Sequence, residues 1–169
     1  MSCWNNKNLN EEISNTEINV TDSLKFDNPI QNNLCEKKIT EFNIDEISIS
    51  GVEHGASSSE IEMILGNPDS ITEYDNELSN EVHSLYYYGE SYFDLVQDSV
   101  VSFNIEGSKL IFDNLNLTSG SSLLSCTSLS LIKIKNGRIR IPIKYRDEAI
   151  IFAIDQNKNV KSIYHWVNW

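Results

Sequence analysis

The chain has 169 residues, 40% of them hydrophobic and 9% aromatic, which is enough for one compact domain or two small repeats sharing a core. Its formal net charge of −12 is uneven: residues 1–120 hold 22 acidic and 5 basic side chains, whereas residues 121–169 hold 3 acidic and 8 basic ones. The acidic balance argues against nucleic acid as a ligand because phosphates would be repelled, and the chain has no run of about 20 apolar residues to span a membrane.

Residues 1–38 contain few apolar side chains and no sustained period, so we expect a flexible polar tether or arm. Cys3 is followed by a tract rich in Asn and Glu, and this arrangement resembles a mature bacterial lipoprotein whose cysteine thiol carries the lipid. It predicts membrane attachment through Cys3 and a location in the periplasm or at the outer membrane. An incidental cysteine in a cytoplasmic protein is the alternative.

Two further cysteines, Cys35 and Cys126, are candidates for a disulfide if the protein resides in an oxidising compartment. A bond between them would close a loop of roughly 90 residues and stabilise the fold by about 4 kcal/mol in the chain-entropy account. In the cytoplasm both would be small buried hydrophobic residues.

Residues 57–69 have the start and stop signals of a short helix. Ser57 and Glu60 have the spacing of a capping box, and Gly66 followed by Pro68 ends the helix. Ile61, Ile64 and Leu65 form an apolar stripe at helical spacing. The segment predicts a helix that packs against another element.

Residues 39–108 form the first predicted repeat, in which a strand precedes this helix and three strands follow it. Three segments between 81 and 105 are rich in aromatic and β-branched residues and are separated by tight polar turns, as in an antiparallel meander. The dozen residues between the helix and the meander are expected to be a link.

Residues 109–169 form the second predicted repeat, whose helix, over 119–129, has weaker signals. Asn136-Gly137 is a strong hairpin signal, and the strand after it alternates Ile with Lys or Arg up to residue 145. Pro142 confines that strand to a sheet edge or a bulge. Two more strands, 149–154 and 160–166, complete the repeat.

The predicted fold class is therefore α+β. Short helices pack on one face of an antiparallel sheet, and the chain consists of two degenerate repeats, each with a helix followed by a meander.

The segment from Gly51 to Ile105 resembles the family of the β-lactamase inhibitory protein and the small outer-membrane lipoprotein of the barrel-assembly machinery. The resemblance rests on a capped helix ending in Leu-Gly-x-Pro-Asp, here 65–69, and on the aromatic strand 85–89 with its hairpin. The tandem form is more similar to the inhibitory protein, although this chain lacks a cysteine pair inside each repeat. The resemblance implies a binding module of the bacterial envelope with no cofactor.

No set of residues predicts catalysis. The three histidines have no metal-ligand spacing, no Gly-x-Ser-x-Gly elbow accompanies the serine clusters, and no phosphate-binding glycine loop is present. We therefore expect a protein that is not an enzyme and binds neither a metal nor a cofactor.

Aromatic side chains on a sheet face not covered by helices are better candidates, because such rings dominate protein interfaces. Alternation along the strand 86–88 places at least one tyrosine on each face. The candidate partner-binding residues, with acidic neighbours included, are Tyr86, Tyr88, Tyr92, Glu81, Glu90, Asp94, Tyr164 and Trp166.

These features predict a binding protein that sequesters or inhibits a protein partner. An immunity protein against a secreted toxin fits them best. An acidic surface would attract a basic partner, although solubility explains the acidic balance equally well. The basic C-terminal strands are expected to pair with the acidic part of the molecule, and a small patch for an anion is the alternative. A membrane-anchored accessory protein of envelope assembly is the second predicted function.

Overall fold

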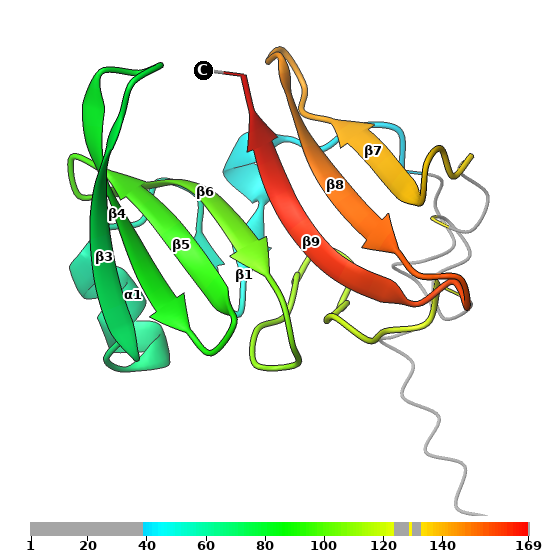
Figure 1. The fold of residues 1–169 in the computed structure, drawn as a ribbon, viewed down its shortest axis with the longest axis horizontal. Helices are drawn as coiled ribbons and strands as arrows, with labels where there is room; N and C mark the ends of the chain where they lie inside the picture. Colours follow the sequence, from blue (N-terminus) through cyan, green and yellow to red (C-terminus); the bar gives the residue numbers. More distant parts are fainter. Residues whose placement is uncertain (1–38, 124–128, 130–132, 169) are drawn as a thin grey trace, which may run out of the picture.

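The computed structural model describes residues 39–123, 129 and 133–168. The predicted tether 1–38 and the cysteines Cys3, Cys35 and Cys126 lie outside this part of the chain. Seven antiparallel strands form one sheet in the order β3-β4-β5-β6-β9-β8-β7 (Figure 1). The strands are β3 (Ser70–Asn76), β4 (Glu81–Tyr88), β5 (Ser91–Val96), β6 (Ser99–Ile105), β7 (Arg138–Pro142), β8 (Glu148–Ile154) and β9 (Val160–Val167).

The predicted α+β class with helices packed on a sheet is wrong, because the fold is mainly antiparallel sheet. Among the described residues the structure has one α-helix, α1 (Ser58–Leu65). The other covering pieces are the 3-10 turn η1 (Ile44–Glu46), a ribbon of β1 (Ser48–Ile49) and β2 (Val52–Glu53), and the loop 106–123. The helix expected over 119–129 lies partly outside the described residues, and its first residues form a turn.

Helix α1 has the capping predicted from its sequence. The Glu60 amide donates to Ser57 Oγ at 3.3 Å, and the Ser57 amide donates to Glu60 Oε2 at 2.7 Å. The Ser58 amide donates to Asp98 Oδ1 at 3.0 Å, so a carboxylate from the β5–β6 turn lies at the positive end of the helix. These contacts fix the helix start against the sheet.

The sheet consists of two consecutive meanders whose last strands meet in the middle. Strands β3 to β6 form one half and β7 to β9 form the other. Only two residue pairs, Asn104 with Tyr164 and Ile105 with Ile163, join β6 to β9, and beyond them the two strands diverge (Figure 1). Each half therefore keeps its own surface while sharing the sheet.

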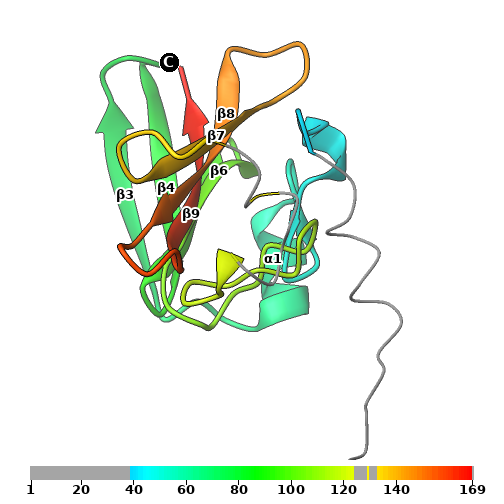
Figure 2. The same ribbon diagram turned by 90° about the vertical axis from the view of Figure 1, so that its right-hand side faces the viewer.

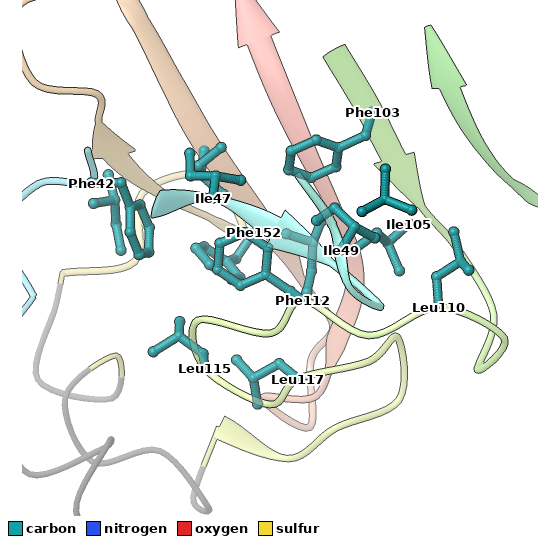
Figure 3. Packing of buried hydrophobic residues seen from close by; sticks show 14 of the residues in the cluster. Phe42, Ile47, Ile49, Phe103, Ile105, Leu110, Phe112, Leu115, Leu117 and Phe152 are labelled. Atoms are coloured by element: carbon teal, nitrogen blue, oxygen red, sulfur yellow. The ribbon is translucent and has the colours of Figure 1, made fainter. Parts of the chain in front are cut away.

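Both halves bury side chains in the same core. Phe112, from the covering loop, is fully buried and lies against Phe42, Phe103 of β6 and Phe152 of β8, with ring centroids 5.4, 6.2 and 5.7 Å away (Figure 3). Phe103 and Phe152 belong to different halves, so one aromatic ring links them. The contacts with Phe42 and Phe152 are edge-to-face, and such contacts add to the stabilisation from buried area.

The hairpin predicted at Asn136-Gly137 is present. Lys135 and Arg138 exchange two backbone hydrogen bonds of 3.0 Å, and both turn residues have positive φ, as a type I′ turn requires. Strand β7 ends at Pro142 and lies at the sheet edge, as predicted for a strand containing proline.

Candidate functional site

Among the described residues, the elements outside the seven-stranded sheet cover one of its faces, and we call the other the open face. Helix α1, β1 and the covering loop lie on the same side of it (Figure 2). Side chains alternate along each strand, so the register assigns every residue to a face. The covered face carries Tyr86, Tyr88, Phe93, Leu95, Phe103, Ile105, Ile139, Ile141, Ile150, Phe152 and Ile163.

One row of residues on the open face crosses all seven strands. We call it the cross-sheet row. Its members lie directly opposite one another on successive strands, and they are Ser70, Tyr87, Tyr92, Asn104, Tyr164, Ile151 and Arg140. Three tyrosines and an arginine in one row provide large amphipathic side chains on an uncovered surface, the composition of protein-binding sites.

The tyrosines of the cross-sheet row are half-buried. The rings of Tyr87 and Tyr92 lie 5.6 Å apart, and partial burial raises the pKa of Tyr92 above its usual value. A protonated phenol can donate or accept a hydrogen bond, and its ring contributes apolar area. The row therefore offers both kinds of contact.

The structure separates the aromatic candidates predicted from sequence. Tyr88 is buried in the core and its hydroxyl donates to the Gly66 carbonyl at 2.9 Å, while Tyr86 packs against the same core. Tyr92, Tyr164 and Trp166 lie on the open face. The structure therefore brings together three of the five predicted rings.

The acidic candidates are also separated. Glu81 accepts a hydrogen bond of 3.0 Å from the side chain of Gln97, and Glu90 is exposed in the β4–β5 turn. Asp94 is buried, and it binds His83 Nδ1 at 2.9 Å and accepts from the Tyr74 hydroxyl at 3.2 Å. The three candidates do not form one acidic surface.

The Asp94 cluster links three strands. Burial raises the pKa of Asp94, although the hydrogen bonds from His83 and Tyr74 act to lower it, and burial raises the pKa of Tyr74 to about 12. His83 has no exposed surface, and its Nε2 lies 3.2 Å from Ser79 Oγ. A histidine with no exposure cannot reach a substrate directly, so the geometry fits a role in holding β3, β4 and β5 together.

A basic groove occupies the other end of the open face. Its volume is about 380 Å³, and its lining residues are Lys133, Lys135, Asn136, Arg138, Arg140, Ile151, Tyr164 and Trp166. Strand β8 contributes the small side chains Ala149 and Ala153 to this face, whereas its neighbours β7 and β9 contribute long ones. The hollow follows from this difference in side-chain length.

A second hollow, of about 430 Å³, lies between α1 and β2 and has Glu53, His54 and Glu60 in its wall. Behind it the rings of His54 and His165 lie 5.7 Å apart, and His165 Nε2 lies 3.0 Å from Glu148 Oε2. Burial lowers the pKa of His165 to about 4 and also lowers the pKa of His54, so both rings are neutral at pH 7.

In the described residues no three His, Cys, Asp or Glu side chains are grouped as a metal site would require. The part of the chain that the structure covers also has no helix long and apolar enough to cross a membrane.

Tyr87 and the four cations of the basic groove are not among the site residues predicted from the sequence. The alternation of Ile with Arg at 138–141 placed the arginines on the solvent side, but they were expected to pair with the acidic part of the molecule. Tyr87 could have been chosen over Tyr86 and Tyr88 only with knowledge of which face the helix covers.

No protein-family model and no curated protein matches the chain. One similar solved structure is a cysteine-rich secretory protein from Staphylococcus aureus, with a TM-score of 0.42 and 15% sequence identity. The match covers 76% of this chain and 48% of that one, so the chain spans about half the length of that protein. The resemblance to the β-lactamase inhibitory protein family stays a prediction.

Proposed function

We propose that the chain is a non-enzymatic binding module that holds a protein partner on the open face of its seven-stranded sheet. The observation that carries the proposal is the cross-sheet row, in which Tyr87, Tyr92 and Tyr164 lie on a surface left open by the described elements. Tyrosine combines a large rigid contact area with a polar end and is enriched where binding energy concentrates.

The tyrosines of the row are held on a regular sheet, and a surface held in place binds a partner at a lower entropy cost than one that must rearrange. The rings of the row project from strands β4, β5 and β9, and their neighbours along each strand are buried in the core. Side chains held on regular strands lose little freedom when a partner binds, which lowers the entropy cost of association.

The charge of residues 39–108, which comprise the β3–β6 half and the elements beside it, supports a partner with a basic region. Residues 39–108 contain 15 Asp or Glu and no Lys or Arg. A surface of one sign attracts the opposite sign over about a Debye length and so raises the association rate. Inhibition of a toxin is one use of such a face, and it stays a prediction.

Photo-crosslinking tests the proposal. We expect p-benzoylphenylalanine in place of Tyr92 or Tyr164 to crosslink the same protein in cells that produce the chain. Placed at Met63, which is 78% exposed on α1, it should not capture that protein. No crosslinked protein from either tyrosine position, or an identical pattern from position 63, would contradict the proposal.

With the captured protein purified, the double substitution Tyr92→Ala/Tyr164→Ala should weaken binding at least about tenfold, as for hot-spot aromatic residues. Met63→Ala is the matched control and should leave the affinity unchanged. Titration calorimetry measures both, and equal affinities would rule out the cross-sheet row as the binding surface.

A further inference from the structure

The basic groove holds four positive charges on a chain whose net charge is −12. Lys133, Lys135, Arg138 and Arg140 are all exposed. Within the described residues, the ion pairs of Lys and Arg are Lys109 with Asp69 and Arg146 with Glu148, and none involves the groove. The expected pairing of these cations with acidic residues is therefore absent within the part of the chain that the structure describes.

The floor of the groove and the wall that β9 contributes are apolar or aromatic. Ile151 is 7% exposed at the floor, while Tyr164 and Trp166 form the β9 wall. The Arg140 guanidinium lies 4.6 Å from the centre of the Trp166 ring. Stacking on the ring orients a guanidinium and leaves its N–H groups, which lie in its own plane, free to bind a carboxylate.

The groove and the cross-sheet row overlap, because Tyr164, Ile151 and Arg140 belong to the row and also line the groove. A partner lying along the row would therefore reach the groove without leaving the sheet. The cations at this end would attract the part of the partner that carries negative charge.

We propose that the basic groove binds an acidic segment of the protein partner, with carboxylates on the four cations and an apolar side chain between Trp166 and Ile151. This inference rests on the proposed function and specifies the chemistry of one part of the partner. The partner then carries opposite charges at two places, a basic region toward β3–β6 and an acidic segment in the groove.

A short acidic segment fits this surface better than a long polyanion. A nucleic acid strand carries its charge along its whole length, so beyond the groove it would meet the β3–β6 half of the sheet. That half has no Lys or Arg to contact phosphates. A segment of a few acidic residues meets only the groove.

Two synthetic peptides test the chemistry on the full chain. The acidic probe is Glu-Glu-Leu-Glu-Glu-Leu-Glu-Glu with a fluorescent label, and the neutral probe replaces each Glu with Gln. We expect the acidic probe to bind at least tenfold more tightly by fluorescence anisotropy, and its affinity should fall as salt is raised. Equal binding of the two probes overturns the proposal.

Charge-matched variants locate the binding. Arg138→Gln/Arg140→Gln should weaken the acidic probe at least tenfold, whereas Lys144→Gln/Lys158→Gln removes the same charge outside the groove lining and should have less than a threefold effect. Equal losses in both variants would show attraction by net charge alone and would overturn the groove as the site. Trp166→Ala should weaken the acidic probe without changing the slope of its salt dependence.

Two further outcomes would also overturn the proposal. One is an oligothymidylate of equal charge that binds more tightly than the acidic peptide. The other is self-association of the chain, detected by sedimentation and lost in Arg138→Gln/Arg140→Gln, because a second copy would then fill the groove. Crosslinks from positions 92 and 164 without peptide binding would contradict this inference and leave the proposed function standing.

Discussion

The two halves of the sheet are built alike and differ in surface charge. Each is an antiparallel meander with alternating buried and exposed positions, and each has its last strand at the centre of the sheet. Residues 39–108 have 15 acidic side chains and no Lys or Arg, whereas residues 133–168 have 3 acidic and 8 basic ones. The two parts of the chain therefore carry opposite net charges.

The two halves therefore share one core and differ in the side chains that they expose. Core residues from β6 and β8 meet around Phe112, so neither half buries its apolar face alone. On the open face, by contrast, Tyr87 and Tyr92 lie in the β3–β6 half of the cross-sheet row and Arg140 lies at its β7 end. Substitutions can therefore be placed in the common core, where they affect both halves, or in one half.

The largest effect should follow from removing the ring that links the halves. Phe112→Ala deletes a fully buried side chain in contact with three other rings, and we expect a loss of about 3–5 kcal/mol in the free energy of unfolding. Denaturant unfolding followed by fluorescence and circular dichroism should show one transition, because both halves lose the same contact.

Ile111→Ala is the control for this substitution, since Ile111 is the chain neighbour and is 37% exposed. It should cost less than about 1.5 kcal/mol. Two separate transitions in the Phe112→Ala variant, one for each half, would show that the halves do not depend on a common core.

A smaller effect on stability is expected from the titration of His165 on β9. Burial lowers the pKa of His165 to about 4 from its ordinary 6.5. Below pH 6.5 the unfolded chain binds a proton that the folded chain does not, so the free energy of unfolding should fall as the pH drops from 6.5 to 4. The shift corresponds to at most about 3 kcal/mol.

The groups that face His165 are Glu148, Arg146 and His54. His165→Gln keeps a donor for Glu148 and does not titrate, so urea unfolding across this pH range should show a weaker pH dependence in the variant. All other ionisable residues are the same in both proteins. If the difference in the free energy of unfolding between the unsubstituted protein and His165→Gln is the same at pH 7 and pH 4, His165 is not the cause of the pH dependence.

The smallest effect on stability is expected from the cap of helix α1, which lies beside the β3–β6 half. Ser57→Ala removes the helix cap that Ser57 provides to the Glu60 amide, and we expect a loss of about 1 kcal/mol in thermal or denaturant unfolding. Glu62→Ala, at an exposed position of the same helix, should change stability by less than about 0.5 kcal/mol. Similar losses in both variants would mean that the cap contributes nothing specific.

Much of the local structure could be predicted because it depends on local chemistry. The capping box of α1, the exit at Gly66 and the turn at Asn136-Gly137 each follow from backbone requirements within a few residues. The sequence predicts a link in place of strand β3, because the strand is polar and exposed along its length. An edge strand with so little burial shows no hydrophobic period in its sequence.

The candidate site was harder to predict because it depends on how distant strands align. Tyr86, Tyr87 and Tyr88 are equivalent in sequence, and only the covering layer decides that the middle ring faces outward. The basic groove needs β7, β8 and β9 side by side, with alanines in the central strand. The expected fold class failed for a related reason, because the covering layer is made of irregular segments that carry no regular period.

Strand β3 ends the sheet with seven exposed or half-buried residues, and its outer backbone groups have no neighbouring strand in the described structure. Such an edge is a template for sheet-to-sheet polymerisation. Glu73 and Asp75 stand on one side of this strand, so a second copy pairing with it would bring carboxylates together. The acidic residues of this half therefore also protect the molecule from aggregation.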